Sequence, residues 1–144
     1  MKHIAALAAA AAISLGCGAC VRSPLPPALQ AGTALPEPRP LGALALQDEQ
    51  GRPFDRARLS GRRSLVMTGF THCPDFCPTT LALLQQLRRR VPPQRVQFVF
   101  LSVDPARDTP DALRSYLASF GGGIVGVTGT SAEVARFTRE LGLG

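Results

Sequence analysis

The chain has 144 residues, a net charge of +6 and 45% hydrophobic residues, which is the size and apolar content of one globular domain. Nearly all of the positive charge comes from arginine, and because the arginines are scattered in sequence without a basic–aromatic motif, we expect no nucleic-acid binding. A modest attraction to anionic lipid heads or to an acidic partner stays open. The four cysteines form two pairs, Cys17 with Cys20 and Cys73 with Cys77.

Residues 1–20 have the pattern of a secretory leader. After a short charged start, the apolar run 4–15 is too short for a comfortable membrane span and suits a signal peptide. The run ends in Ser-Leu-Gly-Cys17, which resembles a bacterial lipobox, in which the cysteine carries the lipid. Cys20 is a second candidate, and plain cleavage near Ala19 is the alternative. We expect an exported lipoprotein on the periplasmic side of the cell membrane, an oxidising compartment.

Residues 21–40 contain six prolines, which cannot join a helix interior or a central strand. This segment is predicted to be an extended tether. The remaining residues, 41–144, are predicted to form the domain. The domain begins with the pattern of a hairpin, in which two short strands at 44–46 and 52–54 flank a turn.

Strands and helices then alternate. Apolar runs predict strands at residues 64–70, 96–103 and 124–127, and helical periodicity predicts helices at 79–91, 110–120 and 131–141. Thr109 is predicted to cap the second helix. Thr130 and Glu133 are predicted to form a capping box at the third helix. This order predicts right-handed crossovers and a parallel sheet core, the α/β class.

The most reactive stretch is residues 68–78, which holds Cys73 and Cys77 between a strand and a helix. The partial positive charge at a helix start favours a thiolate. The spacing allows the two sulfurs to form a disulfide or to hold one metal ion. Zinc with four ligands is disfavoured, because His72 is the only histidine outside the leader. Cu(I) binding and thiol–disulfide exchange both suit the pair, and a structural disulfide or two buried cysteines is the remaining alternative.

Two motifs, Thr71-His-Cys-Pro-Asp-Phe-Cys-Pro78 and Ser102-Val-Asp-Pro-Ala-Arg-Asp-Thr-Pro110, resemble the SCO/SenC family. These are thioredoxin-fold copper chaperones that help to assemble the dinuclear copper centre of cytochrome c oxidase. The resemblance implies a thioredoxin-like fold with an N-terminal hairpin and a copper ion as ligand. It also implies that Cys73 and Cys77 bind copper and cycle between dithiol and disulfide. The implied partners are the copper-bearing oxidase subunit and a thioredoxin-like reductase, and membrane tethering agrees with the leader.

Asp104 matches the acidic residue of the second motif. The resemblance implies that it supports the site geometry or a reductase contact, and a loop-capping carboxylate is the alternative. Pro74 and Pro78 would fix the loop and the start of the helix. The third copper ligand of the family is a histidine on a later loop, which this chain does not reach. We therefore expect a domain that is incomplete at its C-terminus, with an unpaired sheet edge and an incompletely covered core.

The resulting functional expectation is a copper chaperone. The alternatives are a thiol–disulfide oxidoreductase that reduces the cysteines of a partner, and an inactive truncated remnant. A peroxidase is disfavoured, because peroxidatic cysteines usually stand without a second cysteine so close. Whether the protein is an enzyme is left open, since a metallochaperone is not one and a reductase is.

Overall fold

The structure is a computed structural model that describes residues 31–35 and 37–143. The predicted leader, most of the predicted tether and Cys17 therefore lie outside the described residues. Residues 31–35 are exposed and form neither helix nor strand, and the helices and strands of the described residues lie in the compact unit that begins at Glu37. Within the described residues, no helix has the length and apolar character that a membrane span requires.

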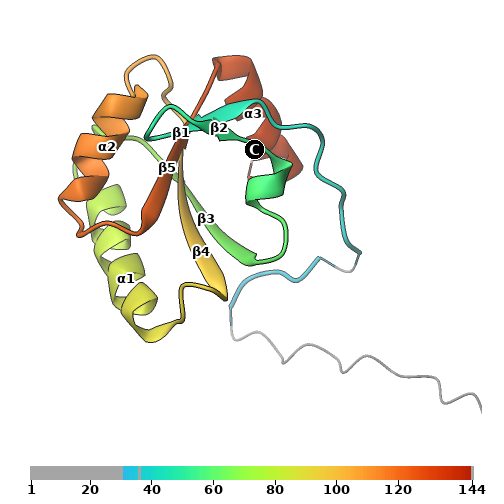
Figure 1. Ribbon diagram of the computed structural model, residues 1–144, viewed down its shortest axis with the longest axis horizontal. Coiled ribbons are helices and arrows are strands. Elements are labelled where there is room, and N and C mark those ends of the chain that lie inside the picture. The colour runs from blue at the N-terminus through green and yellow to red at the C-terminus, as the bar shows by residue number, and fades with distance from the viewer. Residues whose placement is uncertain (1–30, 36, 144) are drawn as a thin grey trace, which may run out of the picture. The chain divides into compact units, whose positions relative to one another are not determined.

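A five-stranded mixed sheet is the centre of this unit, with the strand order β2-β1-β5-β4-β3 (Figure 1). The strands are β1 (Leu46–Asp48), β2 (Pro53–Phe54), β3 (Arg63–Gly69), β4 (Val96–Ser102) and β5 (Ile124–Thr128). The strands β3, β4 and β5 are parallel, whereas β1 is antiparallel to β5 and to β2. This arrangement confirms the predicted α/β class, the hairpin and the parallel core.

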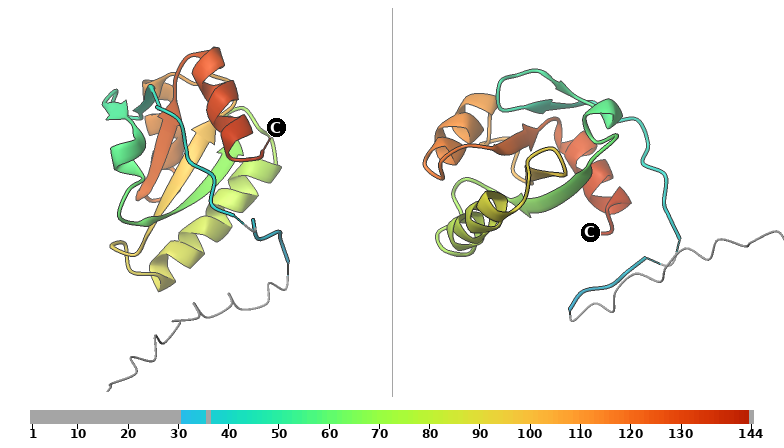
Figure 2. Two further views of the ribbon diagram at one scale, coloured as in Figure 1. Left: turned by 90° about the vertical axis from the view of Figure 1, so that its right-hand side faces the viewer. Right: turned by 60° about the horizontal axis from the view of Figure 1, so that its bottom comes forward.

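Three helices cover the two faces of the sheet. They are α1 (Phe76–Arg90), α2 (Pro110–Ala118) and α3 (Ser131–Glu140), and a short 3₁₀ helix, η1 (Arg56–Arg58), was not predicted. The helices α1 and α2 pack on one face and α3 on the other (Figure 2). Each β-strand of the parallel core therefore runs between two layers.

The predicted start of α1 was wrong by three residues. The helix begins at Phe76, so Pro78 lies inside its first turn, where the missing N–H of proline costs no intrahelical hydrogen bond. Leu87 continues the apolar spacing of this helix, but its side chain is 40% exposed. The buried face instead runs through Leu81, Leu84 and Gln85, and ten residues after Cys77 the helix has turned Leu87 away from that face.

The predicted caps of the other helices are confirmed on the N-terminal side. The hydroxyl of Thr109 accepts the N–H of Ala112 at 3.2 Å, and that of Thr130 accepts the N–H of Glu133 at 3.2 Å. The carboxylate of Glu133 accepts a hydrogen bond from Arg136 at 2.5 Å. Among the described residues, the Thr130 bond of the predicted capping box is therefore present, whereas the Glu133 side chain pairs with Arg136 of the same helix.

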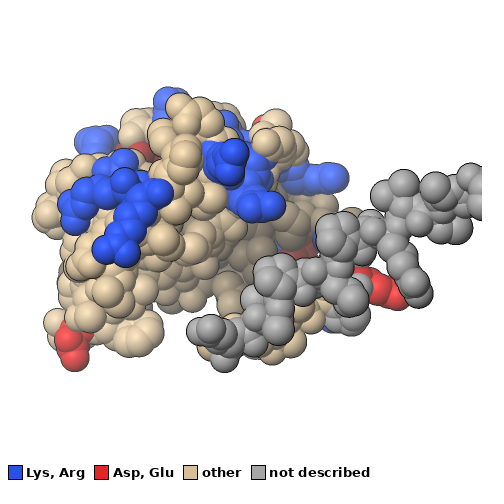
Figure 3. Space-filling model, turned by 90° about the horizontal axis from the view of Figure 1, so that it is seen from below, with Lys and Arg blue, Asp and Glu red and all other residues tan. Residues whose placement is uncertain are grey.

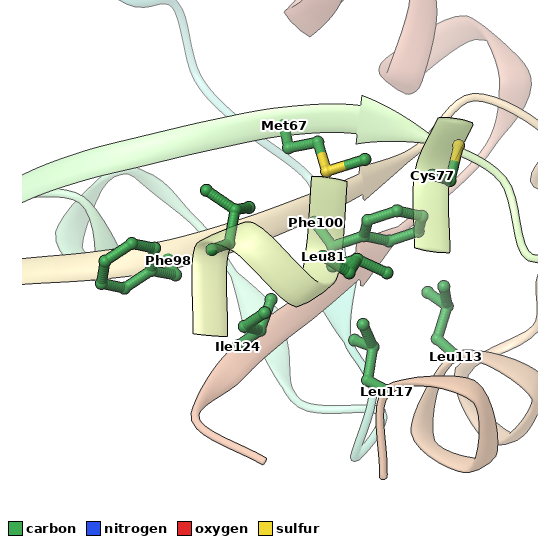
Figure 4. Packing of buried hydrophobic residues seen from close by; sticks show 9 residues of the cluster. Met67, Cys77, Leu81, Phe98, Phe100, Leu113, Leu117 and Ile124 are labelled. Carbon is green, nitrogen blue, oxygen red and sulfur yellow. The ribbon is translucent and has the colours of Figure 1, made fainter. Parts of the chain in front are cut away.

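Strand β4 is buried on both faces, as its continuous apolar run predicts. Phe98 and Phe100 point to the cluster under α1 and α2, which Figure 4 shows, and Val99 and Leu101 point to the cluster under α3. All four side chains are at most 2% exposed. Strand β3 lies at an edge of the sheet and pairs with β4 alone among the described strands, which agrees with the expected unpaired edge.

Candidate metal and thiol site

The two cysteines lie at the carboxyl end of the parallel strands, the usual place for a site in an α/β sheet. Cys73 is in the loop that follows β3 and is half-buried, whereas Cys77 is in the first turn of α1 and is only 3% exposed. Both are free thiols in this structure. Cys73 can therefore be reached from solvent, whereas Cys77 is covered by Cys73 and by the core.

Hydrogen bonding orders the two thiols. The backbone N–H of Cys77 donates to the Cys73 sulfur at 3.3 Å. The pKa of Cys73 is lowered, first by a hydrogen bond from the Cys77 thiol and then by backbone N–H groups at the start of α1. The pKa of Cys77 is raised, first by burial and then by its hydrogen bond to Cys73. When one proton is lost, the thiolate therefore resides on Cys73 and the remaining proton on Cys77.

Gly69, the last residue of β3, makes room for the buried sulfur. A Cβ atom at this position would lie 2.9 Å from Cys77 Sγ and 2.8 Å from Cε2 of Phe100, distances at which one group must move. Figure 4 shows Cys77 at the edge of the core beside Phe100. The close approach of α1 to the strand thus depends on a glycine that the sequence reasoning did not single out.

The hydroxyl of Tyr116 on α2 adds a polar group near the thiols. It is buried and has no hydrogen-bond partner among the described residues. The pKa of Tyr116 is raised, first by burial and then by negative charge on Cys77 and Cys73. Buried hydroxyl groups are normally hydrogen-bonded in folded proteins, so this one is an exception.

Asp108 is the carboxylate that holds the cysteine loop. It is completely buried and accepts hydrogen bonds from the Thr71 N–H at 3.0 Å, the Thr71 hydroxyl at 2.6 Å and the Ser102 hydroxyl at 2.6 Å. These contacts join the loop after β3 to the end of β4. After burial and the thiol pair, the negative charge of Asp108 also contributes to the raised pKa of Cys77. The sequence reasoning missed this role, although Asp108 stands in the second motif just before the helix cap Thr109.

Asp104, the predicted supporting residue, bonds within its own loop. Its carboxylate pairs with Arg107, and its N–H donates to the Ser102 hydroxyl at 3.1 Å. Its carbonyl accepts the N–H groups of Arg107 and Asp108. Among the described residues it makes no hydrogen bond to the loop at 71–77. This arrangement corresponds to the loop-capping alternative, and a supporting role at the site stays a prediction.

His72 points toward the carboxylate side of the site. Its ring is 61% exposed, and its Nδ1 atom lies 3.0 Å from the Thr71 hydroxyl and 4.0 Å from Oδ1 of Asp108. Within residues 31–35 and 37–143, no three His, Cys, Asp or Glu side chains are grouped so that they could hold one metal ion. The donors that the described residues bring together are two sulfur atoms, which suit a soft ion such as Cu(I).

One large apolar side chain beside the thiol pair is exposed. Phe76, which lies between the two cysteines in the sequence, is 74% exposed. A large exposed aromatic side chain beside a reactive group is typical of a contact surface.

An α/β sheet that presents a thiol pair at the start of a helix defines a thioredoxin-like protein with a thiol-based site. The profile of the SCO1/SenC family matches residues 35–143, and the chain belongs to this family. A relative from Stutzerimonas stutzeri is 39% identical over 112 residues, or 76% of this chain. The mitochondrial protein SCO2 of Saccharomyces cerevisiae is 42% identical over 96 residues, or 65% of this chain.

Solved structures confirm the thioredoxin-like fold of the family. The structure of Bradyrhizobium japonicum ScoI with copper bound is 37% identical, with a TM-score of 0.65, over 69% of this chain and 64% of that chain. The present chain spans 55% of the length of the Stutzerimonas relative and 32% of yeast SCO2. It therefore corresponds to about half or less of these two relatives and to nearly two thirds of ScoI.

Proposed function

We propose that this protein carries Cu(I) as cargo on Cys73 and Cys77 and delivers it to the copper-bearing subunit of cytochrome c oxidase. The single observation that carries the proposal is the paired thiol site, in which the Cys77 N–H contacts the Cys73 sulfur at 3.3 Å. Membership of the SCO1/SenC family and similarity to a copper-bound ScoI structure support copper as the cargo.

The donor chemistry suits a soft ion of low coordination number. Two thiolates hold Cu(I) with a net charge of −1, and the N-terminus of α1 favours negative charge at this position. Binding displaces the thiol protons, so the affinity should rise with pH until both thiols are ionised. Because Cys77 is 3% exposed, an incoming ligand from an acceptor protein meets Cys73 first. Delivery then proceeds by exchange of the Cys73 sulfur before the Cys77 sulfur.

Competition between the reduced full chain and a chromophoric Cu(I) chelator tests the proposal. We expect that Cys73→Ser and Cys77→Ser each lose strong Cu(I) binding and that the control His72→Asn keeps it, because His72 faces Asp108. Parent-like Cu(I) affinity in the double serine variant would refute the assignment. A large loss in His72→Asn would show that the imidazole, and not the sulfur pair alone, is the donor.

A second candidate is a thiol–disulfide oxidoreductase, favoured by the opposite pKa directions of the two thiols. The Cys73 thiolate would attack a partner disulfide and release one partner thiolate. Cys77 would then displace the second partner sulfur and leave a Cys73–Cys77 disulfide. Two electrons pass to the partner, and a thioredoxin-like reductase would restore the dithiol. Cys77→Ser should trap the mixed disulfide on Cys73, and turnover of a disulfide substrate without such an intermediate would exclude this path.

The location is part of the proposal. The signal-like pattern of residues 1–20 and the prolines of residues 21–40 support an exported domain that is held at the periplasmic side of the membrane by a lipid on Cys17. In cells, Cys17→Ala should move the protein from the membrane fraction to the soluble periplasmic fraction, and Cys20→Ala should not. The reverse result would assign the lipid to Cys20, and membrane retention of both variants would exclude a lipid anchor at either cysteine.

A further inference from the structure

Arginine side chains gather at the end of the sheet opposite to the thiol site. Residues 52–63 and 88–95 hold nine arginines and one acidic residue, Asp55. Residues 59–62 lead into β3 and residues 91–95 lead into β4, so these parts of the two segments lie at the amino ends of parallel strands (Figure 1). Seen from below, this end shows several groups of arginines and few acidic side chains (Figure 3). The fold thus concentrates charge that is scattered in the sequence.

A pocket of about 380 Å³ opens in this region, which is large enough for a small ligand. Its charged lining consists of the four arginines Arg52, Arg58, Arg62 and Arg88. The rest of its lining includes Gln97 and the apolar residues Val96 and Phe98 of β4. An opening bordered by four guanidinium groups and no lining carboxylate attracts anions.

Two of these guanidinium groups are held by one buried carboxylate. Asp48 is completely buried, and its Oδ2 atom accepts the Nε–H of Arg52 at 2.8 Å and lies 3.4 Å from Nη2 of Arg58. The guanidinium of Arg58 also lies over the ring of Phe54, 5.6 Å from its centroid. Because one carboxylate faces two guanidinium groups, the cluster of Asp48, Arg52 and Arg58 keeps a net charge of +1.

The third guanidinium is positioned without a carboxylate. The Arg88 Nε–H donates to Oε1 of Gln85 at 2.9 Å, and the buried Gln85 amide donates to the Gly122 carbonyl at 2.7 Å. The guanidinium also lies close to Gly123, where a Cβ atom would be 2.6 Å from Nη1 of Arg88. Within residues 37–143, no carboxylate lies within 4.0 Å of Arg88 or Arg62.

We propose that this pocket is a binding site for a phosphate-bearing anion, with Arg62 and Arg88 as its principal ligands. The planar fork of arginine matches the oxygens of a phosphate and can bind it with two parallel hydrogen bonds. The charge retained by Arg52 and Arg58 around Asp48 adds to the attraction. The site is separate from the thiol pair and does not depend on the proposed copper cargo.

Calorimetric titration of the full chain with pyrophosphate, at low and at high salt, tests the site. We expect Arg62→Gln and Arg88→Gln each to weaken binding by about tenfold to a hundredfold, because each removes charge-assisted hydrogen bonds. The matched control is Arg89→Gln, which removes the same charge from the same helix end but from a residue outside the pocket lining. It should change the affinity by less than about threefold, a rim-charge effect that salt screens.

Thermal unfolding of each variant verifies that it is folded, and Arg88→Lys keeps the charge while it removes the fork. Weak pyrophosphate binding in Arg88→Lys supports the proposal. Absence of pyrophosphate binding to the parent, or equal losses in Arg88→Gln and Arg89→Gln, would overturn it in favour of diffuse surface charge.

Vesicles distinguish the two sources of the phosphate. If the phosphate belongs to a lipid headgroup, the protein should sediment with vesicles that contain phosphatidylglycerol but not with pure phosphatidylcholine. Arg62→Gln and Arg88→Gln should abolish this sedimentation, and Arg89→Gln should not. Pyrophosphate binding without sedimentation assigns a soluble anion. Either pattern supports the pocket. Sedimentation that is insensitive to all three substitutions, without pyrophosphate binding, contradicts it.

Discussion

Replacing Asp108 by asparagine should lower the stability of the fold and also lower the pKa of Cys77, the two properties that this carboxylate affects at the thiol site. Asp108 is completely buried and accepts three hydrogen bonds from Thr71 and Ser102, at 3.0, 2.6 and 2.6 Å. Asparagine retains the shape but only one oxygen acceptor, so the two bonds at the Oδ2 position become neutral and the Thr71 hydroxyl must turn to accept from the new amide N–H. At roughly 1 kcal/mol for each bond, partly offset by the relief of burying a charge, we expect a loss of about 2 kcal/mol in unfolding free energy.

The same substitution should make the Cys77 thiolate easier to form, although it weakens the fold. Burial is the first cause of the raised pKa of Cys77, and the negative charge of Asp108 adds to it. Removing that charge makes the Cys77 thiolate easier to form, so its pKa should fall toward the ordinary value while the fold is weakened. The measurements are urea unfolding of the reduced chain and the pH dependence of Cys77 alkylation in a Cys73→Ser background.

Asp104→Asn is the matched control, because it removes an equal charge from the same loop. Its carboxylate pairs with the exposed Arg107, and such surface pairs contribute about 1 kcal/mol or less. We expect little change in the unfolding free energy and none in the pKa of Cys77. If Asp108→Asn changes the unfolding free energy by less than about 0.5 kcal/mol, or leaves the Cys77 pKa unchanged, then Asp108 does not hold the cysteine loop as inferred here.

Three further outcomes follow from the same contacts. Iodoacetamide should label Cys73 before Cys77, because hydrogen bonds lower the pKa of Cys73 and burial raises that of Cys77. The Cys73 labelling rate should reach half of its maximum at a pH below the ordinary thiol pKa of about 8.5. Equal labelling of both cysteines at every pH, measured by mass spectrometry, would contradict this. Gly69→Ala should weaken Cu(I) binding and cost about 1–3 kcal/mol of stability, since its Cβ would lie 2.9 Å from the Cys77 sulfur, and parent-like values in both assays would show that α1 can retreat freely. Thr109→Ala should cost about 1 kcal/mol in urea unfolding because it removes the cap of α2, and Thr109→Ser, which keeps the oxygen, should restore most of it.

Local signals in the sequence predicted most of the fold. The apolar run at β4 and the proline after Thr109 act over a few residues, and the structure confirms the strand and the capped helix that they predict. The start of α1 was misplaced because Pro78 was taken to mark the helix start, with the helix itself beginning at Thr79. Proline is tolerated anywhere in a first turn, so its position does not distinguish a start at Phe76 from one at Thr79.

The supporting parts of the site depend on contacts that the sequence does not encode locally. Asp108 meets Thr71 across 37 positions of the chain, and the role of Gly69 follows from how closely α1 crosses β3. The arginines were read as scattered because only their spacing in sequence was visible. Arg62, in the turn before β3, and Arg88, in the last turn of α1, line one pocket, a grouping that exists only once the parallel register is formed.

The exposed ring of Phe76 couples recognition to chemistry. It stands next to Cys77 in the chain and is 74% exposed. Covering such a ring is favourable by about 25 cal/mol for each Å² of apolar area that is removed from water. A partner with a matching apolar surface would gain this free energy beside the cysteine loop, whereas a small hydrophilic thiol would not.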